Sequence, residues 1–166
     1  RTMDKAREVM FTKDYQQILE IKEEEQTVDR LCSGINNYVI KLSSLSLNEK
    51  EQQHVASILQ ILSDIERVSD YCENISEFAE TLTERKAVFT EIGTKEMREM
   101  IETCADSFKY AVEAFTENDK DKAMKVIEKE SQADDLEIRL RTEHMKRLAN
   151  NQCNTDAGIV YLDALV

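Results

Sequence analysis

The chain has 166 residues and a net charge of -12 at pH 7, with 34% charged residues, three glycines and no proline. This length is typical of one domain that can bury a core, and a chain so poor in turn-forming residues is not expected to be an all-β protein. The acidic balance and the lack of a basic stripe argue against a nucleic-acid partner, and no apolar run approaches the roughly 18 residues of a membrane span.

The four cysteines are far apart in the sequence and form no C-x-x-C pair. Cys32, Cys72 and Cys104 each fall on an apolar stripe, which is where buried free thiols usually occur. We therefore expect reduced core cysteines in a cytoplasmic setting rather than a disulfide framework or a zinc site.

Helical periodicity predicts that the chain is almost all helix, beginning with a short helix over residues 3–11 and a break at 12–14. A second helix is predicted from residue 15 to about 45. Its apolar stripe recurs in steps of three and four, with one gap, at Glu25. An acid therefore occupies a core position. The stripe consists of Ile18, Ile21, Val28, Cys32, Ile35, Val39 and Leu42.

Ser46 and Glu49 have the spacing of a capping box, which predicts the start of a third helix that runs to about Thr83. This helix carries two apolar stripes, so it is expected to contact two neighbouring helices. One stripe turns acidic in the middle of the helix, at Glu66, Asp70 and Glu73.

In the second half, residues 84–93 read as a connection and Thr94 as the cap of a fourth helix. A fifth helix is predicted over about 119–149, again with acids inside its stripe. A last helix is expected from residue 156. Its apolar stripe has not ended at Val166, so we expect the helix to continue past that residue. The stripe of the fifth helix is Ile127, Glu130, Asp134, Ile138, Met145 and Leu148.

An internal repeat relates the two halves, because Glu25 and Asp29 recur as Glu130 and Asp134 at an offset of 105 residues. The sequence therefore predicts one domain over residues 1–166, built from two antiparallel three-helix repeats. The first repeat covers about 1–83 and lacks most of its opening helix. The second covers about 94–166 and lacks most of its closing helix.

Three pairs of acids have the form Glu-x-x-x-Asp, which places both carboxylates on one helical face. Like charges at this spacing repel, and on a partly buried stripe they also lose hydration. A shared cation would offset both costs, and hard oxygen ligands suit iron, manganese, magnesium or calcium and can also bind zinc. The pairs are Glu25 with Asp29, Glu66 with Asp70, and Glu130 with Asp134.

The geometry of a hairpin favours a shared site for the first two pairs. Asp29 lies about 17 residues before the end of its helix and Glu66 about 18 after the start of the next, so the two levels coincide at a rise of 1.5 Å per residue. The alternative is that these acids pair with basic residues such as Lys22, Arg30 and Arg67 in a metal-free helical adaptor.

The segment Ile65-Glu66-Arg67-Val68-Ser69-Asp70-Tyr71-Cys72-Glu73-Asn74-Ile75 resembles the hallmark E-R-(I/V)-(G/S)-D-x-x-x-N-I helix of the PhoU family. The resemblance covers essentially the whole chain. It is nearest to the PhoU-like domain at the cytosolic C-terminus of bacterial type II sodium/phosphate cotransporters. The pattern similar to that group is Tyr38-Val39-Ile40-Lys41-Leu42-Ser43-Ser44-Leu45 followed by Leu47-Asn48-Glu49.

This resemblance implies an all-α bundle that regulates phosphate uptake through contacts with a membrane-embedded transporter, which is expected to be part of the same polypeptide. It implies a cytoplasmic domain of an inner-membrane protein, with a homodimer as an option. The implied cofactors are metal ions, iron or zinc first and magnesium, manganese or calcium as alternatives. One cluster would use Glu25, Asp29, Glu66 and Asp70; a second would use Glu130, Asp134 and acids on the last helix, where the expected motif falls past Val166.

Other candidate chemistry is sparse, and we do not expect an enzyme. Glu51 and His54 have the Glu-x-x-His spacing of di-iron bundles, but no second such motif accompanies them. His144 is expected on the bundle surface. The sequence contains no P-loop, no dinucleotide-binding glycine pattern and no evident nucleophile–base pair.

Overall fold

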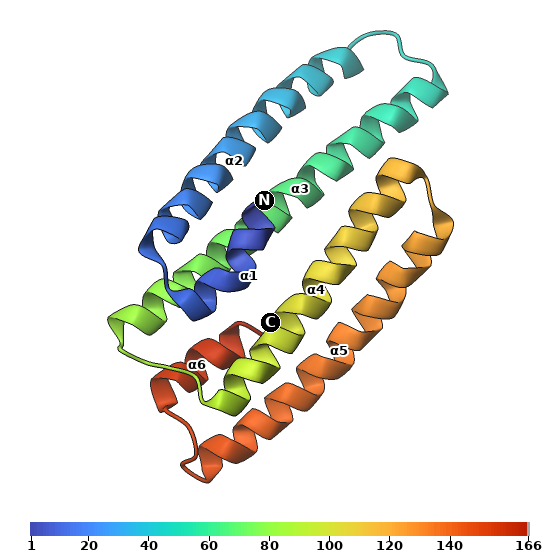
Figure 1. Ribbon diagram of the computed structural model, residues 1–166. Coiled ribbons are helices and arrows are strands. Elements are labelled where there is room, and N and C mark those ends of the chain that lie inside the picture. Colours follow the sequence, from blue (N-terminus) through green and yellow to red (C-terminus); the bar gives the residue numbers. More distant parts are fainter. Residues whose placement is uncertain (166) are drawn as a thin grey trace. The chain divides into compact units, whose positions relative to one another are not determined.

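The computed structural model describes residues 1–165, and all the regular structure in that part of the chain is helical (Figure 1). This confirms the predicted all-α class. The chain divides into two compact units, Arg1–Glu77 and Phe78–Val166, and each is described by itself. The helices are α1 (Thr2–Thr12), α2 (Tyr15–Ser43), α3 (Glu49–Glu84), α4 (Glu91–Glu117), α5 (Lys120–Ala149) and α6 (Thr155–Asp163).

In the first unit, α1 packs against the first part of α2. Lys13 adopts the left-handed conformation that ends α1, and the Asp14 carboxylate caps α2 by accepting from the backbone of Gln16 and Gln17. The apolar residues that this contact buries are Ala6, Val9, Met10, Ile18 and Ile21.

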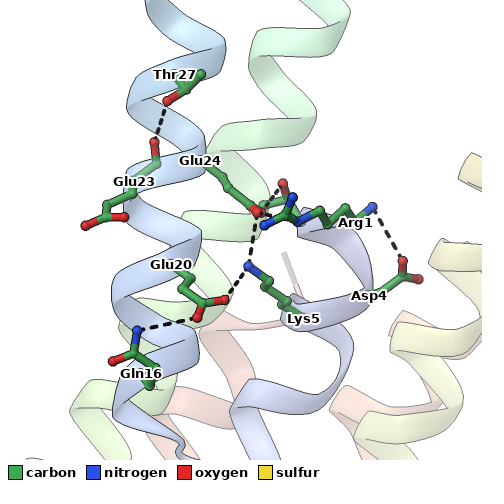
Figure 2. Close-up of polar contacts among 9 residues, drawn as sticks. Arg1, Asp4, Lys5, Gln16, Glu20, Glu23, Glu24 and Thr27 are labelled. Carbon is green, nitrogen blue, oxygen red and sulfur yellow. Dashed lines mark hydrogen bonds and ion pairs between the residues drawn. The ribbon is translucent and has the colours of Figure 1, made fainter.

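Ion pairs at the edge of the α1–α2 contact add to this packing (Figure 2). Lys5 Nζ lies 2.5 Å from Glu20 Oε2 and 3.0 Å from Glu24 Oε1, and Arg1 Nε lies 2.9 Å from the same Glu24 oxygen. Thr2 also donates to Glu24, over 2.7 Å. Acids on this face of α2 are therefore neutralised by basic side chains of α1.

The capping box of α3 lies two residues later than the sequence predicted. Asn48 Oδ1 accepts from the Glu51 backbone over 3.0 Å, and Glu51 Oε2 accepts from the Asn48 backbone over 2.8 Å. Asn48 therefore takes the role expected of Ser46, because an asparagine side chain caps at least as well as serine. The Glu51 carboxylate is engaged in this capping box. The Glu-x-x-His spacing of Glu51 and His54 is therefore accounted for by helix capping.

In the second unit, α4 and α5 pack along their lengths and α6 packs on α5. Asp119 and Asn154 cap α5 and α6, close to where the sequence placed these starts. The predicted cap of α4 was wrong. Thr90, not Thr94, accepts from the backbone of Gly93 over 3.1 Å, so the helix begins four residues earlier.

The predicted buried stripe of α5 was also wrong. Ile127, Ile138 and Met145 are 57%, 64% and 52% exposed, whereas Leu136, Leu140 and His144 are buried. A helix with apolar residues on two faces gives two possible stripes, and the neighbours α4 and α6 select the second.

Two further predictions about buried groups fail. Cys32 and Cys72 are buried as expected, but Cys104 is exposed. His144 lies in the interior of the second unit, not on the surface. Among the described residues, no helix is both long and apolar enough to cross a bilayer.

Candidate metal centre

Three carboxylates from two helices of the first unit converge on one point. Glu25 and Asp29 project from one face of α2 and Asp70 projects from α3, and one oxygen of each lies within 4.8 Å of the others. Two oxygens bound to one cation at about 2.0–2.6 Å lie no more than about 5 Å apart. The donor set therefore fits one hard cation held by Glu25, Asp29 and Asp70.

This group differs from Glu24 in the charges that surround it. Glu24, the residue before Glu25, is paired with Lys5 and Arg1 (Figure 2). The charges that raise the pKa of the Glu25 carboxyl group are those of other acids, Asp29, Glu73 and Asp70. The side chain of Arg30, the nearest basic residue in sequence to Asp29, bonds to the Gln26 carbonyl and the Thr27 hydroxyl instead.

Glu25 is the buried member of the group, with 8% of its surface exposed. Burial raises the pKa of its carboxyl group to about 7, assisted by the charge and hydrogen bond of Asp29 and by the charges of Glu73 and Asp70. Without a cation, the group therefore holds a proton near neutral pH. A bound cation would replace that proton.

This geometry predicts how stability depends on pH in the metal-free protein. The folded pKa of Glu25 lies above the ordinary value of 4.5, so the folded state binds the proton more tightly than the unfolded chain. The stabilising contribution is complete below about pH 4.5 and is lost as the pH rises through about 7. We expect this contribution to the free energy of unfolding, measured in the presence of a chelator, to disappear over that range.

Denaturant titrations at several pH values measure this effect. Glu25→Gln keeps the shape and removes the titrating group, so the fall that Glu25 causes between about pH 5 and 8 should be absent from this variant. Glu23→Gln, at an exposed position of the same helix, should retain the wild-type slope. A Glu25→Gln variant with the same dependence on pH as the wild type would contradict the assignment.

Glu66, the fourth predicted ligand, is half-buried and lies outside the group of three. It lines a cavity of about 310 Å³ between α2 and α3, together with Cys32 and Asn36. Cys32 donates weakly to the Leu62 carbonyl over 3.8 Å, and burial raises the pKa of its thiol, as do the charges of Glu66 and Asp29. A ligand role for Glu66 remains a prediction.

Glu130 and Asp134, the predicted second pair, are both exposed on α5. They join no group of three or more metal-binding side chains within the part of the chain that the structure describes. Their metal-binding role also remains a prediction.

Glu73 is an acid near this site that lies on the predicted acidic stripe of α3 but was not among the predicted ligands. Its charge contributes to the raised pKa of Glu25, so it lies close to the cluster. The signal was available, because Glu73 is three residues after Asp70 and falls on the same helical face.

Comparisons with known proteins identify the family of this chain. The PhoU domain model matches residues 1–79 and 97–165, and so includes both units. A phosphate-specific transport system accessory protein PhoU homolog from Aquifex aeolicus is 29% identical over 144 residues, which are 86% of this chain and 64% of that protein. The corresponding PhoU homolog 1 of Thermotoga maritima is 25% identical over 113 residues, 68% of this chain and 48% of that protein.

The chain thus spans about half to two thirds of the length of these curated relatives. The family match extends over most of the chain and includes every residue of the carboxylate group on α2 and α3. The chain therefore belongs to the PhoU domain family.

Proposed function

We propose that this chain is a regulatory domain of phosphate transport that binds a metal ion and acts by contact with a membrane-embedded phosphate transporter. The observation that carries the proposal is the convergence of Glu25, Asp29 and Asp70 from two helices on one point. The curated relatives support the phosphate-transport context, since both are named as accessory proteins of a phosphate-specific transport system.

The finer form of the proposal places the domain in the cytoplasm as part of a sodium/phosphate cotransporter. Its support is the similarity of residues 38–49 and 65–75 to the PhoU-like domains of that group. In this form the transporter and the domain belong to the same polypeptide, so the contact is intramolecular. A homodimer of the domain is compatible with the proposal.

The proposed role of the metal is structural. A cation bound by Glu25, Asp29 and Asp70 would neutralise three facing carboxylates and fix the register of α2 against α3. Carboxylate oxygens suit iron, manganese, magnesium or calcium, and zinc accepts them as well. With the register fixed, the two helices present a rigid surface to the transporter. We propose no catalytic step.

A second candidate is a metal-free helical adaptor. It is favoured by one observation, the hydrogen bond between Glu25 and Asp29, which lets a shared proton satisfy the pair without a cation. Chelator treatment separates the two candidates, because removal of metal lowers the melting temperature of a metal protein and leaves that of an adaptor unchanged.

Phosphate uptake by cells that produce the full-length protein tests the regulatory role. The variant Glu25→Gln/Asp29→Asn/Asp70→Asn should lose the change in uptake that wild-type cells show when external phosphate becomes abundant. Glu23→Gln/Asp64→Asn, altered at exposed positions of the same helices, should respond as wild type. A triple variant that regulates uptake normally would exclude the proposed role of the metal site.

A further inference from the structure

The second unit contains a buried polar cluster that the metal centre does not involve. Tyr161 of α6 is fully buried, and its hydroxyl donates to Glu96 Oε2 of α4 over 2.7 Å. Arg147 of α5 donates to both carboxylate oxygens of Glu96, and its Nη1 atom lies 2.9 Å from Glu96 Oε1. One acid therefore connects three helices.

The ring of His144 lies against this cluster. It stacks on the Tyr161 ring with centroids 4.2 Å apart and planes inclined by 16°, while Phe89 contacts Tyr161 edge-on at 5.8 Å. His144 is 4% exposed, and its ring nitrogens make no well-formed hydrogen bond with the described residues, although the Gly158 backbone lies close enough to favour its proton. The largest side chain of α6 is thus held between an imidazole, a phenyl ring and a carboxylate.

Gly158 is what lets α6 approach the imidazole so closely. A Cβ atom at this position would lie 3.1 Å from His144 Nε2 and 2.9 Å from Leu148 Cδ2. Because both contacts are shorter than normal for a methyl group, a side chain here would push α6 away from α5. The packing of α6 therefore places its backbone directly against the His144 ring.

A proton on His144 would meet an unfavourable set of charges. From α4 it faces Glu96, whose two oxygens are already engaged; from α5 it faces the cation of Arg147; from α6 it faces the neutral Tyr161. The exposed pair of Arg85 with Asp156, 3.3 Å apart, holds the start of α6 but does not screen this interior.

The effect on ionisation follows from these contacts. Burial lowers the pKa of His144, as does the charge of Arg147, while Glu96 and the Gly158 backbone partly offset them. The unfolded chain therefore binds this proton more tightly than the folded unit, so stability falls as the pH drops below the ordinary histidine value of 6.5. Attraction of an imidazolium to the Tyr161 ring face acts in the opposite direction, but it supplies no acceptor for the two N–H groups.

We propose that α6 is a proton-sensitive helix, which leaves its place on α4 and α5 when His144 becomes charged between Tyr161 and Arg147. The release exposes Tyr161 and opens the end of the bundle where α4 begins and α5 ends. This response is independent of the metal centre, whose residues all lie in the first unit. It gives the domain a way to change its surface on acidification.

Hydrogen exchange of the α6 amides, corrected for the intrinsic pH dependence of exchange, tests the proposal. Between about pH 7.5 and pH 5.5, protection of residues 157–163 should fall by up to about tenfold in the wild type, while the middle of α2 keeps its protection. His144→Phe keeps an aromatic ring against Tyr161 without a titrating group, so its α6 protection should be independent of pH. His54→Gln, at the exposed histidine of α3, should behave as wild type.

Two results would overturn the proposal: wild-type α6 protection that does not change with pH, or an equal loss in His144→Phe. Should that variant not fold, the titration of His144 by NMR in the wild type decides. The proposal requires His144 to titrate below the ordinary histidine value of 6.5, and an equal or higher pKa would contradict it.

Discussion

Replacing Glu25, Asp29 and Asp70 together by glutamine and asparagine should abolish stabilisation of the first unit by metal. A ligand present at about 100 times its Kd stabilises the folded state by about 2.7 kcal/mol, which corresponds to about 10 °C or more in the melting temperature of a unit of this size. We expect the wild type to gain about this much when manganese or zinc is added to chelator-treated protein, and the triple variant to gain nothing. Melting curves with and without metal measure both values.

The same experiment separates loss of metal from general damage to the fold. In the absence of metal, the amides remove the repulsion between facing carboxylates, so the variant should be at least as stable as the wild type at about pH 8. A matched variant, Glu23→Gln/Asp64→Asn/Glu77→Gln, changes exposed acids of the same two helices and should keep the metal response. An unchanged metal response in the triple site variant would exclude this site.

Glu96→Ala should be among the most damaging single substitutions in the second unit, with a loss of about 3–5 kcal/mol. The side chains of Glu96 and Arg147 are 10% and 12% exposed, so removing the acid leaves a buried guanidinium without its partner. The substitution also takes away the acceptor of the buried Tyr161 hydroxyl. Denaturant unfolding followed by circular dichroism gives the loss directly.

Glu99→Ala is the matched control. It removes another α4 glutamate paired with an α5 arginine, but Glu99 and Arg139 are 53% and 48% exposed over a distance of 3.1 Å. Exposed pairs of this kind contribute less than about 1 kcal/mol. Comparable losses of unfolding free energy in the two variants would contradict the claim that burial makes the Glu96–Arg147 pair the more stabilising one.

Much of the fold could be predicted because the information is local. Asp14, Asp119 and Asn154 are side chains that cap helices well, and they set three of the helix starts within about one residue. The errors at Ser46 and Thr94 arose where several capping residues lie close together in sequence. Which of them caps is decided by the path of the loop, as at Asn48 and Thr90.

Burial was harder to predict, because it depends on the neighbours of a helix. The stripe of α5 that includes Ile138 is as apolar in sequence as the one that includes Leu136 and Leu140, yet α4 and α6 cover the second. His144 was misplaced for the same reason, since its burial depends on Tyr161 and Gly158 of a helix that follows later in the chain. Periodicity shows which face of a helix is apolar, but not which neighbouring helix covers that face.

The group of carboxylates on α2 and α3 could be predicted from the sequence, because Glu25 interrupts an apolar stripe. An acid at a core position of an apolar stripe is costly unless something compensates it, and the spacing along the hairpin brought Asp29 and Asp70 to the same level. Glu66 and Asp70 were treated alike because they share a helical face. The structure separates them, since only Asp70 points its carboxylate at Glu25 within the distance of a shared ion.

The central claim is that facing carboxylates of α2 and α3 hold a cation, and elemental analysis combined with native mass spectrometry tests it most directly. Full-length protein purified without chelators should carry at least one metal ion per chain, which is absent from the Glu25→Gln/Asp29→Asn/Asp70→Asn variant and present in the Glu23→Gln/Asp64→Asn/Glu77→Gln control. Wild-type protein that carries no metal, and binds neither manganese, iron nor zinc when these are supplied, would contradict the account.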